Sequence, residues 1–237
     1  MTTNDNNLIP KKNGFHLMNK LASSLATTGF LAFALTGTAS AQFSLKSIPG
    51  VANVTGGGSS APAADLGVQQ DALVRNYVAA NKDVLTANAK MADALGLKDA
   101  AATSKATSDA LTEGATKDSL EASNKVLSTS TDAVAAELAK QPVLDAKSKA
   151  LFSEGLANLA VGVTKYVGVG KNVKDMGSGL SSASPLMLPK LQSAVYVVSN
   201  FPGSMGNVST ALKNAISYAQ SHDIPVPADA TQALAAL

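Results

Sequence analysis

The chain has 237 residues, no cysteine and a formal net charge of +2. Without cysteine it cannot form disulfides, cysteine-ligated metal sites, thioether-linked haem or thiolate nucleophiles. Aromatic residues make up only 4% of the chain, and no stretch alternates apolar and polar residues with enrichment in β-branched types, so strands are not expected.

Residues 1–41 have the features of a secretory signal peptide of bacterial style. Three lysines precede an uncharged run, residues 21–37, and small residues stand at the two positions that define a cleavage site after Ala41. The run is too short and too rich in serine, threonine and glycine for a membrane span. Met18 begins a more usual signal-peptide opening, so we expect translation to start there.

Removing residues 1–41 takes away three lysines and one aspartate, which leaves 16 basic and 16 acidic residues. A neutral chain without a basic cluster is not expected to bind nucleic acid or an anionic membrane. Because no cysteine is present to carry a lipid, we expect a soluble protein in the periplasm or outside the cell.

The next segment, residues 42–64, is rich in Gly, Ser, Pro and Ala, which is typical of a flexible lead-in. From Asp65 onward, two neighbouring rows of apolar residues repeat every seven positions and predict a helix of about 30 residues. Asp65 is expected to cap this helix and Gly96 to end it. The rows are Leu66, Leu73, Ala80, Ala87 and Ala94, and Tyr77, Val84 and Met91. We expect residues 65–237 to form a single helical domain.

Residues 98–140 are more polar. They predict a short helix near residues 98–112, a break at Gly114 and a longer helix to about Lys140, which ends before Pro142 because proline disfavours helix at the preceding residue. The longer helix has one row of Leu120, Leu127 and Val134 and a companion row of Asn124, Thr131 and Leu138. Asn124 and Thr131 either fix the register from inward positions or face solvent.

The following segment predicts a long helix that carries four glycines on its apolar face. Its apolar row is Phe152, Leu159, Tyr166, Val173 and Leu180. At 100° per residue, the four glycines fall within about 80° of arc on the same face. They are Gly155, Gly162, Gly170 and Gly177. Glycine in a helix costs roughly 1 kcal/mol relative to alanine, so we expect close contact with a second helix to compensate. Gly168 and Gly179 lie off this face, and there we expect the helix to bend or end.

Glycines beside Lys171 also raise the question of a phosphate-binding loop. The pattern G-x-x-x-x-G-K-[ST] requires glycine at position 165 and serine or threonine at 172, where the chain has Lys165 and Asn172. A dinucleotide-binding pattern from Gly168 requires glycine at position 173, where the chain has valine. Both patterns fail, so the glycines indicate helix packing.

Two prolines in residues 181–189 predict a turn, and a helix is expected to follow it to about Asn200. The sequence NFPGS at 200–204 predicts a break before a last full helix, Ser204–Ser221. Two further prolines then predict an extended segment and a short apolar tail. The whole pattern predicts an all-α helical bundle of four to six heptad-patterned helices with short loops.

The residues that remain after cleavage offer little for catalysis. His222 is the only histidine and is expected to be solvated or to cap a helix. Arg75 is the only arginine and is expected to lie on an ordinary helix surface, with bidentate binding of a carboxylate or phosphate as the alternative. Carboxylates alternate with lysines as on solvated helix faces. We therefore expect no catalytic, metal-binding or cofactor-binding residues, and an enzymatic function is disfavoured.

These features favour an exported helical protein that acts by binding. Its partner is expected to be another protein of the bacterial envelope, which it would serve as an accessory, scaffold or adaptor, or a second copy of itself. The alternative is a carrier of a small apolar ligand or lipid within the bundle. In either case the candidate positions for close packing or for an apolar pocket are Gly155, Gly162, Gly170, Gly177, Tyr166 and Met176. No membrane span is expected after cleavage.

Overall fold

The computed structural model describes residues 63–237, with side chains from Leu66 onward. The expected signal peptide, the start at Met18 and the lead-in up to residue 62 lie outside this part of the chain. Within residues 63–237 there are six α-helices, one 3₁₀ helix and no strand. The predicted all-α bundle of four to six helices is therefore confirmed.

The first helix, α1 (Ala63–Ala94), is the long apolar helix predicted from the heptads. Both predicted inward rows are buried, and none of their side chains is more than 5% exposed. Gly96 follows the helix with φ of +79°, a conformation that only glycine adopts without a steric penalty. The prediction that Asp65 caps the helix was wrong, because the helix begins two residues earlier at a pair of alanines, which favour helix strongly.

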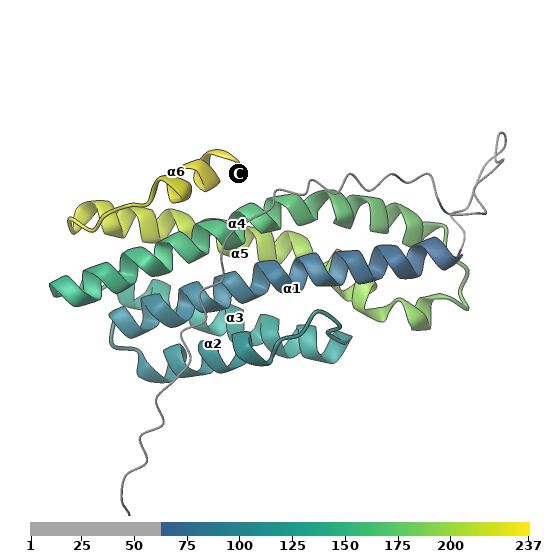
Figure 1. Ribbon diagram of the computed structural model, residues 1–237, viewed down its shortest axis with the longest axis horizontal. Coiled ribbons are helices and arrows are strands. Elements are labelled where there is room, and N and C mark those ends of the chain that lie inside the picture. Colours follow the sequence, from purple (N-terminus) through teal and green to yellow (C-terminus); the bar gives the residue numbers. More distant parts are fainter. Residues whose placement is uncertain (1–62) are drawn as a thin grey trace, which may run out of the picture. The chain divides into compact units, whose positions relative to one another are not determined.

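The next two helices, α2 (Lys98–Ala110) and α3 (Lys117–Leu138), form a helical hairpin, which we call the α2–α3 hairpin. Gly114 lies in the loop between them, as predicted. The Thr116 hydroxyl caps α3 by accepting a hydrogen bond from the Ser119 backbone N–H at 3.3 Å. After α3 the chain turns at Gln141, whose φ is +54°. The hairpin packs against α1 and α5 (Figure 1).

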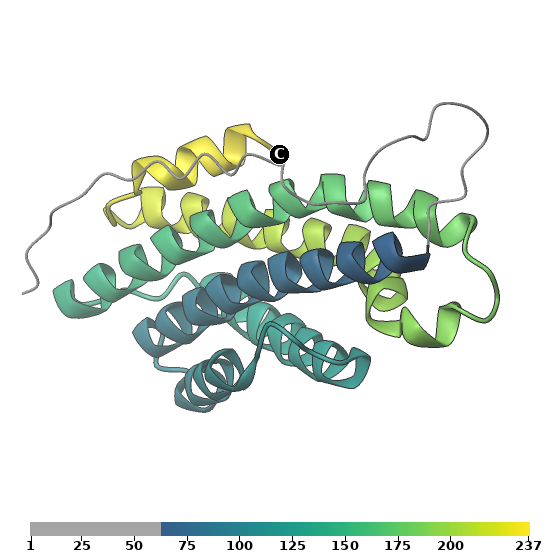
Figure 2. The ribbon, with the colours of Figure 1, turned by 45° about the vertical axis from the view of Figure 1, so that its right-hand side comes forward.

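The longest helix, α4 (Ala146–Ser181), lies antiparallel to α1. Asp145 caps it by accepting a hydrogen bond from the Ser148 backbone N–H at 2.7 Å. The start of α4 contacts the end of α1, and the end of α4 contacts the start of α1. Both views show the two helices side by side (Figures 1 and 2). Two ion pairs flank their contact, Lys90–Glu154 at 3.1 Å and Lys165–Asp83 at 2.6 Å.

A 3₁₀ helix, η1 (Leu188–Lys190), leads into α5 (Gln192–Ser221). The predicted break at residues 200–204 was wrong, because α5 continues through Pro202. Pro202 is exposed, so solvent can hydrogen-bond the carbonyl that lacks a proline N–H partner. Val197 and Val208 are fully buried on either side of it, and their burial in one core favours a continuous helix.

The chain ends with an extended segment and α6 (Ala228–Ala235), as the prolines predicted. The Ser153 hydroxyl donates a hydrogen bond to the Pro225 carbonyl at 2.7 Å and so fastens the extended segment to α4. Ala230 and Ala233 are buried, and α6 packs mainly on α4. Five helices, α1 and α3 to α6, contribute buried apolar residues to the core, and α2 packs against it with the partly buried Ala100 and Ala101.

Candidate functional site

Two of the candidate glycines lie where α4 meets α1. A Cβ on Gly155 would lie 2.7 Å from Met91 Cγ and 3.1 Å from the Met91 backbone nitrogen. A Cβ on Gly162 would lie 2.7 Å from Val84 Cγ2 and 3.1 Å from the Val84 backbone nitrogen. The contacts at 2.7 Å are shorter than carbon atoms tolerate and those at 3.1 Å are tight, so side chains and backbone of α1 together occupy the space that a side chain on α4 would need. No apolar ligand has room at either position.

The other two candidate glycines face α5 and have ordinary space. A Cβ on Gly170 would lie 3.7 Å from the Phe201 ring, and one on Gly177 would lie 3.6 Å from Val198 Cγ1. Gly168 has no atom within 4 Å of its Cβ position. The expectation that Gly179 lies off the contact face was wrong, because its Cβ would lie 2.5 Å from Leu66 Cδ2.

Tyr166 and Met176, the remaining candidates, are both buried in the core. Tyr166 packs edge-on against Tyr77, with ring centroids 5.6 Å apart, and lies 6.0 Å from the Phe201 ring. Its hydroxyl donates a hydrogen bond to Asn81 Oδ1. Met176 takes part only in apolar packing. Tyr166 thus fills the interior and does not line a hollow.

The Tyr166 hydroxyl belongs to a set of hydrogen-bonded groups that we call the Tyr–Asn network. Asn124 is its centre: its Nδ2 donates to the Tyr77 hydroxyl at 2.7 Å and to the Tyr196 hydroxyl at 2.9 Å. Its Oδ1 accepts from Asn81 Nδ2 at 3.1 Å. The network joins α1, α3, α4 and α5 at one level of the bundle. Its members are Tyr77, Asn81, Asn124, Tyr166, Tyr196 and Ser204.

Two tyrosines of this network, Tyr166 and Tyr196, are not poised to lose protons. Burial raises the pKa of Tyr166 well above its ordinary value, and burial also raises the pKa of Tyr196. Both phenols are therefore protonated at neutral pH; the Tyr166 hydroxyl donates to Asn81 Oδ1, and the Tyr196 hydroxyl accepts from Asn124 Nδ2. Because such buried networks are costly unless they are satisfied, the arrangement fixes how four helices align.

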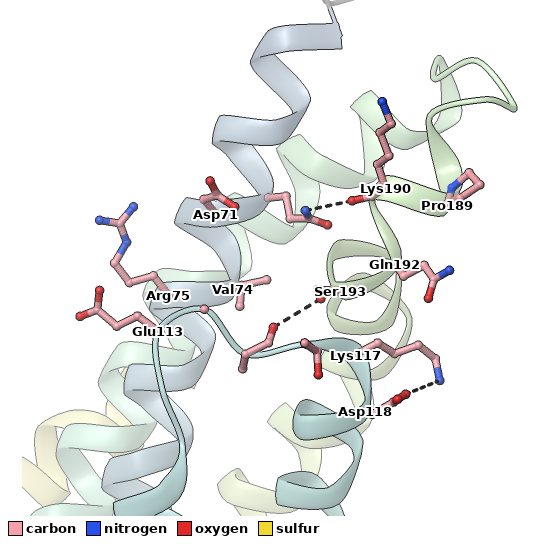
Figure 3. A pocket seen from close by; sticks show the side chains of 14 residues that line it. Asp71, Val74, Arg75, Glu113, Lys117, Asp118, Pro189, Lys190, Gln192 and Ser193 are labelled. Carbon is pink, nitrogen blue, oxygen red and sulfur yellow. Dashed lines mark hydrogen bonds and ion pairs between the residues drawn. The ribbon is translucent and has the colours of Figure 1, made fainter.

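A surface cleft lies where α1, the α2–α3 loop and the start of α5 meet (Figure 3). We call it the Arg75 cleft, and its volume is about 610 Å³. Gln70 Nε2 donates to the Lys190 carbonyl at 3.2 Å, and Ser193 Oγ donates to the Ala115 carbonyl at 3.4 Å. These two hydrogen bonds join its walls. The charged residues that line it are Asp71, Arg75, Glu113, Lys117, Asp118 and Lys190.

Three positive and three negative side chains line the Arg75 cleft. Arg75 is exposed and extends beside Glu113 in Figure 3, and no ion pair joins it to any residue of the described part of the chain. A phosphate in this cleft would meet three carboxylates, whereas a protein surface or peptide with charges of both signs would find partners for each. The cleft is therefore suited to a partner of mixed charge.

Sequence reasoning singled out only Arg75 among the residues of this cleft. Glu113 and Asp118 had been assigned to an ordinary solvated face. The cleft combines segments of chain that are far apart in the sequence, around residues 70–75, 113–118 and 189–193, and no local pattern links them. Only the folding of the hairpin loop over α1 brings these groups together.

His222 caps a helix, which was one of the two roles expected for it from the sequence. It is the C-cap residue of α5, its ring stacks on Tyr218 with centroids 4.1 Å apart, and its Nδ1 lies 3.0 Å from the Tyr218 carbonyl oxygen.

No cluster of three potential metal-binding side chains occurs in the described residues. None of the helices in residues 63–237 is sufficiently long and apolar to cross a bilayer.

Comparisons with known proteins add no family. No family model matches the chain, no curated protein matches it, and no solved structure matches its fold.

Proposed function

We propose that this is an exported protein of the bacterial envelope or extracellular space that acts by binding another protein. The observation that carries the proposal is the Arg75 cleft, an open surface with three cationic and three anionic side chains. Charge patterns of this kind contribute to specificity and to the rate of encounter with a complementary surface.

The core supports a binding role over a carrier role. At Gly155 and Gly162 the side chains of Met91 and Val84 and the α1 backbone beside them leave no space for the apolar ligand of the alternative hypothesis. The buried groups of Tyr77, Asn81 and Tyr166 are used in the Tyr–Asn network to align helices. Four charged side chains of the Arg75 cleft form no ion pair with the described residues, and an accessory, scaffold or adaptor would use them to bind its partner. They are Asp71, Arg75, Glu113 and Lys190.

The experiment compares residues 42–237 with the variant R75E/K190E, immobilised and exposed to a bacterial envelope extract. Both substituted side chains are exposed, so the variant should fold normally, as circular dichroism would verify. A protein retained by the wild type and lost with the variant supports the proposal. A matched control is K213E, because Lys213 is exposed on α5 and does not line the cleft.

Light scattering after size exclusion distinguishes a separate partner from a second copy. Self-association through the cleft would give a dimer that R75E/K190E dissociates. A strict monomer that captures no protein would overturn the proposal.

A further inference from the structure

The buried polar side chains of the described residues are concentrated on one side of the bundle. Apart from tyrosines, all seven lie on α1, α2 or α3, and none lies on α4, α5 or α6. They are Asn81, Asn88, Ser104, Ser108, Ser123, Ser130 and Thr131. Five of the seven belong to the α2–α3 hairpin.

Several of these groups join the hairpin to α1 directly. Asn88 Nδ2 donates to Ser130 Oγ at 2.8 Å and to Thr131 Oγ1 at 2.9 Å. The hydroxyls of Thr86 and Ser108 lie 3.1 Å apart and form a hydrogen bond. We call this set of contacts the polar seam. Polar contacts of this kind give little net stability, because water replaces them when they open.

The polar seam is also incompletely satisfied. Asn88 Oδ1 and Ser104 Oγ are buried and have no hydrogen-bond partner among the described residues. Each such group carries a desolvation cost that opening of the hairpin would relieve. The hairpin contributes no aromatic side chain to the core, so its apolar anchoring rests on Leu111, Ala115, Leu120, Leu127, Val134 and Leu138.

The opposite side of α1 is built differently. There α4 contributes Phe152 and Tyr166 to the core, and its glycines bring the two backbones close together. Every buried side chain of α5 is aliphatic or tyrosine. Apolar burial of this kind is worth roughly 25 cal/mol for each Å² removed from water. Helices α1, α4 and α5 therefore form the more stable part of the bundle.

Residues in a left-handed conformation stand at both ends of the hairpin. Gly96, with φ of +79°, precedes α2, and Gln141, with φ of +54°, follows α3. Both lie in short loops, at the positions where a rotation about the backbone would swing the whole hairpin. They are the natural hinges for such a movement.

From these observations we infer that the α2–α3 hairpin is a cover that opens as a unit along the polar seam while α1, α4 and α5 stay packed. Opening also separates α3 from α5 and breaks the hydrogen bonds of Asn124 in the Tyr–Asn network. The opening would also control the Arg75 cleft. Glu113, Lys117 and Asp118 move with the hairpin, whereas Arg75 stays on α1 and Lys190 on η1. A partner bound across both walls would hold the hairpin closed, because a ligand favours the state that binds it.

Hydrogen exchange of residues 42–237, measured by mass spectrometry at increasing urea without any partner, tests the opening itself. We expect the opening equilibrium constant of the amides in α2 and α3 to exceed that of the buried amides in α1 and α4 by at least tenfold. Their exchange should also depend less on urea, because opening of the hairpin exposes less surface than global unfolding. Equal constants and equal slopes in all four helices would overturn the inference.

A cross-link provides the second measurement. The chain has no cysteine, so T86C/S108C would place one pair across the polar seam, where the native hydroxyls are 3.1 Å apart. When oxidised, this variant should exchange its α2 and α3 amides no faster than those of α1. The same variant kept reduced is the control and should retain the tenfold difference. A difference that persists in the oxidised form would contradict opening along this seam. Because no partner is present, the result is independent of the proposed binding function.

Discussion

Gly162→Ala is the most direct test of the contact between α1 and α4. The added Cβ would lie 2.7 Å from Val84 Cγ2 and 3.1 Å from the Val84 backbone nitrogen. Valine is β-branched and has little rotamer freedom in a helix, and the nitrogen belongs to the helix backbone. The two helices must therefore move apart. Overpacking of this kind typically costs about 1–3 kcal/mol.

Alanine also favours helix over glycine by roughly 1 kcal/mol, and this gain must be separated from the steric cost. Gly168→Ala provides the control, because it lies in the same helix and has no atom within 4 Å of the new Cβ. Gly168→Ala should raise the free energy of unfolding by about 0.5–1 kcal/mol. The difference between the two variants removes the helix-propensity gain and should equal the steric cost, about 1–3 kcal/mol.

Urea unfolding of residues 42–237, followed by circular dichroism at 25 °C, measures both values. The m-value should be unchanged in both variants if the unfolded state is unaffected. If Gly162→Ala and Gly168→Ala stabilise the protein equally, the close approach of α1 and α4 is absent and the reasoning fails.

Three further substitutions test other features. Asn124→Ala removes the centre of the Tyr–Asn network and takes a hydrogen-bond partner from the Tyr77 and Tyr196 hydroxyls. The free energy of unfolding should therefore fall by about 2–4 kcal/mol, and an unchanged urea midpoint would contradict this. Pro202→Ala restores a helical N–H in α5 and should stabilise the protein by about 1–3 kcal/mol, whereas a lower thermal midpoint would show that the proline is required. Hydrogen bonds from the Ser148 backbone and side chain lower the pKa of the Asp145 carboxyl. This carboxylate should therefore stabilise the protein above its unfolded pKa of about 3.9, and the stabilisation should be lost as pH falls through the lower folded pKa. An NMR titration that gives a folded pKa of 3.9 or higher would refute this prediction, and Asp145→Asn should remove this part of the pH dependence of stability.

The sequence predicted the helices whose burial follows a simple repeat. In α1 and α4 a side chain every seven residues must face the core, so the seven-residue pattern of apolar residues predicts which face of each helix is buried. Pro202 led to the wrong prediction of a helix break, because proline disfavours helix locally. Burial of Val197 and Val208 on either side of it keeps α5 continuous. Tertiary packing outweighed the cost of the proline.

Gly179 was misplaced for a geometric reason. Its position was assigned from a straight helix with 100° per residue, but a seven-residue contact line drifts about 20° per heptad from that value. From Gly155 to Gly179 this drift adds up to about 70°, which carries the contact line with α1 toward Gly179. No sequence pattern predicts the Arg75 cleft or the Tyr–Asn network, because the residues of each come from separate segments of the chain.

The glycines of α4 also limit which helices can take its place. Only a helix with glycines at the spacing of Gly155 and Gly162 can lie this close to Met91 and Val84. A foreign amphipathic helix with ordinary side chains at these positions would be held too far away to fill the core. Exchange of α4 between molecules is thus favoured between copies of this chain, and a helix without glycines at this spacing is disfavoured by shape.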